Sequence, residues 1–310
     1  MAMDLKSNLR TPRGALFQSV LIGLMIWLCC ATSPAHAAPL RILWWNASVT
    51  EPKAGPNDRK KIVDYLNRHE NGAEFRVTQI NSNRKGQFAG HLSSADYDMI
   101  IIDSTTPSAL FNRADLDAFR GFYAKSGRRV MLDGTLWIRS TRYTSLSRFP
   151  GKGEVLGKFT LNQLEPFRDT GGILIGTDHD AFQTSANQAL RAIIPDARFS
   201  GRTNPSRDGR FFGDGLLSAS DPVTPIDILR HWESIPSQAE TPVGNFVDFM
   251  GNPVTLYSLV ETSDKPGRKR KRPYISANFD PGQDSVAIDS KVLPDKPKDR
   301  MPTRKSPPKN

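Results

Sequence analysis

The chain has 310 residues, two cysteines and a formal net charge of +10. Both cysteines, Cys29 and Cys30, lie in the N-terminal segment. The rest of the chain therefore has no thiol, which excludes disulfides, cysteine metal ligands and a cysteine nucleophile there. The charge is also local, because residues 264–310 hold 13 Lys and Arg against six Asp, whereas residues 38–263 hold 26 basic and 25 acidic residues. The basic character belongs to the C-terminal tail.

The first 37 residues have the features of a signal peptide. Three basic residues precede an apolar run over residues 15–31. Ala35 and Ala37 then form the small-x-small pattern that signal peptidase accepts, which predicts cleavage before Ala38. An uncleaved membrane anchor is the alternative, although the apolar run is short for a bilayer span. We expect the protein to be exported, to the periplasm or beyond, with no membrane span after cleavage.

Strand and helix signals alternate from residue 40 onward. Short runs of apolar or alternating residues predict strands over 40–45, 75–80, 98–102, 130–132 and 172–175. Helical spacing predicts a helix that is capped by Asn57, a second over 114–126 that Gly127 ends, and a third that runs from Thr184 to Pro195. Strands that alternate with helices and are apolar on both faces indicate a doubly wound α/β fold with a mainly parallel sheet.

The later part of the chain departs from this alternation. Residues 198–222 are rich in Gly, Arg, Asp and Ser and predict a long loop. Thr224 is placed to cap a short helix that follows it. Residues 243–250 and 254–261 resemble two strands joined by a tight turn, which predicts an antiparallel hairpin at one edge of the sheet.

These signals divide the chain into a signal peptide over 1–37, one α/β domain over 38–263 and a basic, Pro-rich, disordered tail over 264–310. Within the tail, only residues 274–279 could pack back as a short strand. The basic run 268–272 suits anionic envelope polymers in an exported protein, and the alternative is a solvated tail that binds nothing. Nucleic acid is not the partner we expect.

Polar residues follow four of the predicted strands at their carboxyl ends, where open parallel sheets bind ligands. They are Asn46, Asp103, Ser104, Asp133, Thr135, Asp178 and His179. In one shared cleft they can bind a small polar ligand such as a sugar. Asp103, Asp133, Asp178 and His179 could also hold a divalent metal ion or share acid–base chemistry. In the alternative interpretation, each aspartate only caps the helix or turn that follows it.

The order of elements over residues 40–195 resembles the class I glutamine amidotransferase-like fold, including its trehalose-utilisation-type relatives, with a flavodoxin- or amidotransferase-like sheet. The residues that carry the resemblance are 98–105, the helix that ends at Gly127, 130–137 and 171–179. In that family a nucleophilic cysteine occupies the sharp turn after a central strand. The corresponding turn here is Asp133-Gly134-Thr135, so the resemblance implies the fold without glutamine hydrolysis.

Two functions remain open from the sequence. The first is a ligand-binding or envelope-associated module without amidotransferase activity, which we favour because the nucleophile is missing beside an intact scaffold. The second is a metal-assisted hydrolase that acts on envelope carbohydrate through the strand-end aspartates. Fold resemblance alone does not decide between them.

Overall fold

The computed structural model describes residues 38–46, 56–82, 84–103, 110–132, 161, 164, 171–176, 183–203, 209–212, 238–262, 271–282 and 285–288. The chain divides into two compact units, Met1–Ala38 and Pro39–Asn310, and every element described below belongs to the second unit. Within the described ranges, no helix combines the length and the apolar character needed to cross a membrane.

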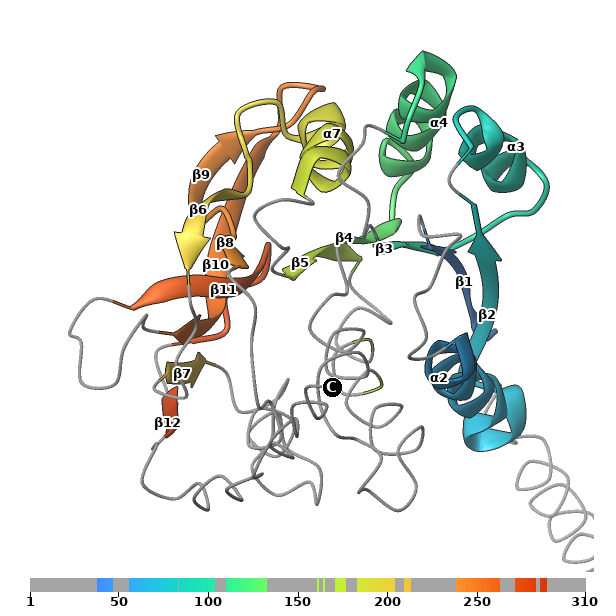
Figure 1. Cartoon of the computed structure of the whole chain (residues 1–310), viewed down its shortest axis with the longest axis horizontal. Helices are drawn as coiled ribbons and strands as arrows, with labels where there is room; N and C mark the ends of the chain where they lie inside the picture. Colours follow the sequence, from blue (N-terminus) through green and yellow to red (C-terminus); the bar gives the residue numbers. More distant parts are fainter. Residues whose placement is uncertain are drawn as a thin grey trace, which may run out of the picture. The chain divides into compact units, whose positions relative to one another are not determined.

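Ten of the described strands form one sheet, one side of which is parallel (Figure 1). The parallel strands are β1 (Leu40–Asn46), β2 (Phe75–Asn81), β3 (Met99–Asp103), β4 (Arg129–Leu132) and β5 (Gly172–Gly176). They lie in the order β2-β1-β3-β4-β5. All five strands were predicted from the sequence, with ends that differ by at most one residue.

Antiparallel strands continue the sheet beyond β5. Next to β5 lies β11 (Arg272–Ala277), followed by β10 (Pro253–Thr262), β7 (Gly209–Phe212) and β12 (Ser285–Ile288). Strand β9 (Gly244–Val247) pairs with β10. This pair is the predicted edge hairpin, so the doubly wound α/β fold with an antiparallel hairpin is confirmed.

Two details of the prediction for the C-terminal half are wrong. The long loop expected over 198–222 contains β6 (Ser200–Thr203), which pairs with β8 (Gln238–Glu240), and β7. Two strands of the main sheet also lie beyond residue 263, where the sequence predicts the domain to end: β11, which overlaps the short strand foreseen over 274–279, and β12, which was not predicted. These strands are short, between three and six residues, and their backbone pairs with strands distant in the sequence.

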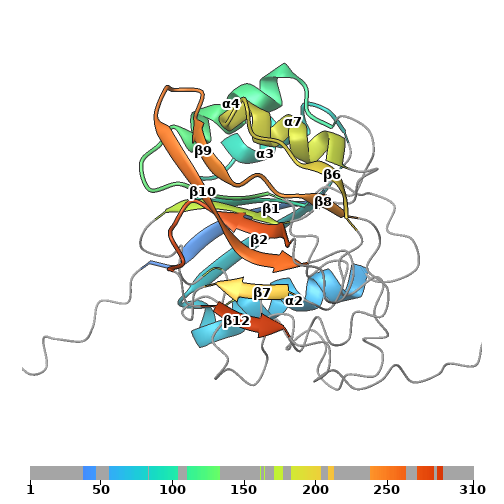
Figure 2. The same cartoon turned by 90° about the vertical axis from the view of Figure 1, so that its left-hand side faces the viewer.

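Helices cover both faces of the sheet (Figures 1 and 2). On one face lies α2 (Pro56–Arg68), which continues into a short 3-10 turn (His69–Gly72). On the other face lie α3 (Gln87–Ser93), α4 (Arg113–Tyr123) and α7 (Gln183–Ile193). The helices α2 and α7 begin just before the predicted caps Asn57 and Thr184, so these two residues lie inside the first turn.

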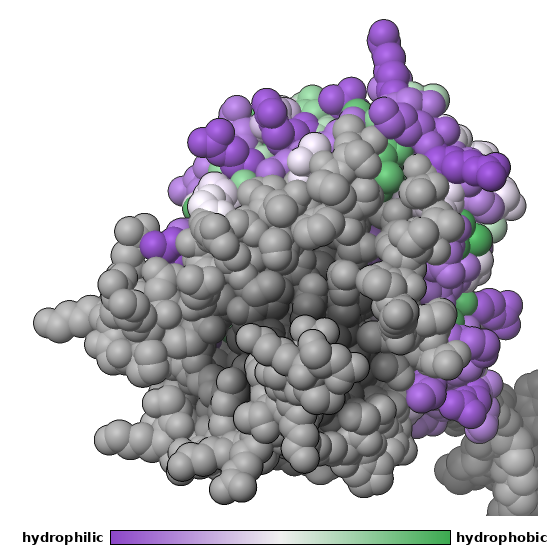
Figure 3. Space-filling view, viewed as in Figure 1, coloured by the Kyte–Doolittle hydropathy of each residue, from purple (hydrophilic) through white to green (hydrophobic). Residues whose placement is uncertain are grey.

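The core consists of two apolar clusters, one on each face of the parallel strands. Because successive side chains of a strand point to opposite faces, β1 contributes Ile42 and Trp44 to the cluster under α2. It contributes Leu43 and Trp45 to the cluster under α3, α4 and α7. In the view of Figure 3 the described surface is mainly hydrophilic, with hydrophobic residues in small separate areas.

Candidate functional site

The order of the parallel strands creates a topological switch point between β1 and β3. The chain leaves β1 toward α2 on one face of the sheet, and it leaves β3 toward α4 on the opposite face. At such a point the two outgoing connections diverge, and a crevice forms outside the carboxyl ends of the two strands. The fold therefore directs attention to the residues with which β1 and β3 end.

These two residues are Asn46 and Asp103, both predicted as site residues. They are paired in the register of β1 and β3. Both are buried, with exposed fractions of 1% for Asn46 and 0% for Asp103. By the alternation of the strands, their side chains lie on the same face as Trp44. The indole N–H of Trp44 donates a hydrogen bond of 3.4 Å to Oδ2 of Asp103.

The pair has a defined hydrogen-bonding character. A carboxylate accepts hydrogen bonds, whereas a side-chain amide both donates and accepts them. The backbone also holds Asn46 in place, since its carbonyl oxygen accepts a hydrogen bond of 2.9 Å from the N–H of Ser82, just after β2. A carboxylate only accepts hydrogen bonds when it is ionised, so the chemistry of Asp103 matches groups that donate, such as hydroxyl or amino groups.

The other predicted site residues lie outside the described residues: Ser104, Asp133, Thr135, Asp178 and His179. The strands that lead to them end side by side, because Ile102 pairs with Leu132, and Leu132 pairs with Ile175. Of the proposed metal ligands, only Asp103 belongs to the described part of the chain. In that part, no group of three or more His, Cys, Asp or Glu side chains is arranged to hold a metal ion.

The two tryptophans of β1 belong to the hydrophobic core. Trp44 and Trp45 have exposed fractions of 0% and 2%, and they point into the two opposite clusters. The ring of Trp45 packs edge-on against Phe88, with the ring centroids 5.3 Å apart. Neither indole presents an open face on which a sugar ring could stack, so the polar contacts at the end of β1 must come from Asn46 and its neighbours.

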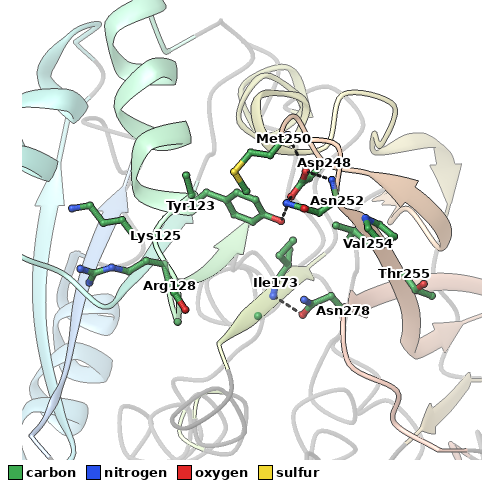
Figure 4. Close-up of a pocket in the computed structure, with 15 residues that line it drawn as sticks. Tyr123, Lys125, Arg128, Ile173, Asp248, Met250, Asn252, Val254, Thr255 and Asn278 are labelled. Carbon is green, nitrogen blue, oxygen red and sulfur yellow. Dashed lines mark hydrogen bonds between the residues drawn. The ribbon is translucent and has the colours of Figure 1, made fainter.

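A second feature, a pocket of about 380 Å3, lies at the amino ends of β4 and β5 (Figure 4). Its walls come from the C-terminal end of α4, the turn between β9 and β10, the start of β5 and Asn278. Tyr123 and Asp248 face each other there, and the Tyr123 hydroxyl donates a hydrogen bond of 3.4 Å to Oδ2 of Asp248. Sequence reasoning missed this pocket, because four segments far apart in the chain build it.

Comparison with models of known protein families, with curated protein sequences and with solved structures finds no match for this chain. The resemblance to the class I glutamine amidotransferase-like fold therefore stays a prediction.

Proposed function

We propose that the protein is a binding module that holds a small, hydroxyl-rich ligand such as a sugar at the carboxyl ends of β1 and β3. The observation that carries this proposal is the pairing of Asn46 with Asp103, two buried polar residues in register at the switch point of the sheet. Asp103 accepts the indole N–H of Trp44, and Asn46 places an amide beside this carboxylate.

The chemistry of the pair favours binding over group transfer. Both carboxylate oxygens of Asp103 accept hydrogen bonds from sugar hydroxyls, while the amide of Asn46 can donate one bond and accept another. General acid–base catalysis on a glycoside needs a second carboxylate, and Asp103 is the only described acid that ends a parallel strand. The runner-up, a metal-assisted hydrolase, depends on residues 133, 178 and 179.

The N-terminal pattern supports the proposal that this binding activity lies outside the cytoplasm. Cleavage before Ala38 would release the chain one residue ahead of the compact unit Pro39–Asn310. N-terminal sequencing of the protein purified from a Gram-negative host should therefore begin at Ala38. A chain that retains residues 1–37 and stays in the membrane fraction would instead identify an uncleaved anchor.

Intrinsic fluorescence tests the ligand site, because the Trp44 indole is bonded to Asp103. The purified protein is titrated with glucose and with N-acetylglucosamine. We expect a saturable change in tryptophan emission with a dissociation constant in the micromolar to millimolar range, about −8 to −4 kcal/mol of binding free energy. The Trp44→Phe variant should bind the sugar but lose most of the emission change.

Two variants separate binding from folding. Asp103→Asn should weaken sugar binding at least about tenfold, because an amide cannot accept on both of its polar atoms. Asp98→Asn is the matched control, since Asp98 directly precedes β3 at the opposite end of the same strand. Should Asp103→Asn fail to fold, Asn46→Ser replaces it. Sugar binding should be unchanged in the control. Unchanged binding in Asp103→Asn or its replacement Asn46→Ser, or no binding of either sugar to the unmodified protein, would overturn the proposal. Asp103-dependent hydrolysis would favour the runner-up.

A further inference from the structure

The pocket at the amino ends of β4 and β5 contains a buried carboxylate that meets only neutral donors. Asp248 has an exposed fraction of 5%. Its Oδ1 accepts hydrogen bonds from the backbone N–H groups of Met250 and Asn252, at 2.9 and 2.8 Å. Its Oδ2 accepts from the Asn252 side chain at 3.1 Å and from the Tyr123 hydroxyl at 3.4 Å. None of the described Lys, Arg or His residues forms an ion pair with Asp248.

Asp248 is ionised at neutral pH. Burial raises the pKa of this carboxyl, but the hydrogen bonds from Asn252, Met250 and Tyr123 outweigh it and hold the pKa below its usual value. Buried charges in proteins are normally paired with an opposite charge. The pocket next to Asp248 therefore has on its wall a hydrogen-bonded carboxylate that no described cation pairs with.

The basic side chains at the rim of the pocket do not neutralise the charge of Asp248. Figure 4 shows that Lys125 and Arg128 extend away from Asp248. Arg128 is bound elsewhere, with its guanidinium nitrogens 2.7 Å from Asp96 and 3.3 Å from Asp98. Among the described residues, neither of these two basic side chains reaches Asp248 and Tyr123. A cation that pairs with Asp248 would therefore have to come from elsewhere.

The remaining walls suit a cation that carries a short apolar chain. Tyr123 and the C-cap Ala124 are at the C-terminal end of α4, where the helix carbonyls have partial negative charge. The ring of Tyr123 offers a π face to a cation. Ile173 and Val254 provide apolar surface beside these polar groups (Figure 4).

We propose that this pocket binds a small primary ammonium ion with a short alkyl chain. Its nitrogen would lie against the carboxylate of Asp248, beside its hydrogen bond with Tyr123, and its chain would rest against Ile173 and Val254. This site lies at the opposite end of the parallel strands from Asn46 and Asp103, so it does not depend on the function proposed above.

The test uses butylammonium chloride as the probe and butanol as the neutral control of the same chain length. NMR titration of the purified protein at low salt should show saturable shifts with butylammonium, with a dissociation constant below about 10 mM. Butanol should bind at least about tenfold more weakly, and added sodium chloride should weaken butylammonium binding, because the interaction is between charges. Equal binding of the two probes would overturn the proposal.

Variants locate the binding site. Asp248→Asn keeps an oxygen for the turn amides and removes the charge, so butylammonium affinity should fall at least about tenfold. Tyr123→Phe keeps the ring and should lower the affinity a few-fold, which provides a readout if Asp248→Asn does not fold. Asp64→Asn on α2 removes the same charge away from the pocket and should bind as the unmodified protein does. Equal losses in Asp64→Asn and Asp248→Asn would contradict the assignment.

Discussion

The backbone N–H of Gly86 donates a hydrogen bond of 2.6 Å to Oδ2 of Asp115, which joins the beginning of α3 to the beginning of α4. The fully buried carboxylate also accepts from the N–H groups of Ala89, at 2.9 Å, and Asn112, at 3.0 Å. Gly86 has no side chain to cap α3, so Asp115 performs that role from the neighbouring helix.

Replacement of this carboxylate should destabilise both helices. Asp115→Ala leaves three backbone N–H groups without their acceptor, and we expect a loss of about 2–4 kcal/mol in the free energy of unfolding. Urea denaturation followed by circular dichroism measures it. The control is Asp117→Ala on the same helix, where the exposed pairs with Arg113 and Arg120 contribute less than about 0.5 kcal/mol. Equal losses in the two variants would show that Asp115 does not act as the shared cap.

Gly86 itself should tolerate no side chain. Its φ of +85° is a left-handed conformation, and a Cβ there would lie 2.9 Å from Nδ2 of Asn112. Gly86→Ala is therefore expected to cost about 1–2 kcal/mol of unfolding free energy. Gly90→Ala within α3 is the matched control, because its Cβ meets no atom within 4 Å, and it should stabilise the protein by up to about 1 kcal/mol. Thermal melts of the two variants should thus shift in opposite directions.

The parallel half of the fold could be predicted because burial on both faces leaves a continuous apolar run in the sequence. Strand β3, with all five residues buried, is the clearest case. Strand β7 could not be recognised, since Gly209 and Arg210 resemble a loop and the strand depends on pairing with β10 and β12. Strand β11 was foreseen only as a short strand over 274–279, and its place in the sheet comes from pairing with β5 and β10.

Of the two candidate sites, one could likewise be predicted from the sequence and the other could not. Asn46 and Asp103 could be found because each is the first polar residue after an apolar strand, and the ends of parallel strands converge. That they are direct neighbours follows only from the strand order β2-β1-β3, which the sequence does not contain. The Tyr123–Asp248 pocket leaves no local signal, because its two polar groups are 125 positions apart in the chain.

Four charged residues form ion pairs at the amino ends of β1, β3 and β4: Arg41, Asp96, Asp98 and Arg128. From these pairs we predict how the stability of the protein depends on acid pH. Hydrogen bonds from Arg41 and Arg128 hold the pKa of Asp96 below its ordinary value of 3.8. Burial raises the pKa of Asp98, but the hydrogen bonds from Arg41 and Arg128 outweigh it, so this pKa is lowered as well. Because both pKa values are lower in the folded state, their stabilising effect is present above about pH 4 and is lost as the pH falls through the folded values.

Removal of one arginine should make the protein more sensitive to acid. In Arg41→Met the two aspartates lose a shared donor, so the midpoint of acid unfolding should move to higher pH. The difference in stability from the unmodified protein should narrow below pH 3.8, where the unfolded carboxyls are protonated. Arg113→Met, at a side chain that is 96% exposed, should leave the acid profile unchanged. An unchanged profile in Arg41→Met as well would contradict this role of the network.

Alkaline pH tests the contact between Tyr123 and Asp248. Burial, together with the nearby charge of Asp248, raises the pKa of Tyr123 from 10.0 to about 12. A raised folded pKa means that the folded protein binds the proton more tightly, so the stabilising effect is complete below pH 10 and is lost as the pH rises toward 12. Tyr123→Phe should remove this part of the alkaline loss in unfolding free energy, which urea denaturation at a series of pH values measures, whereas Tyr257→Phe should retain it. If the loss persisted unchanged in Tyr123→Phe, the Tyr123 hydroxyl would not be held as the structure places it.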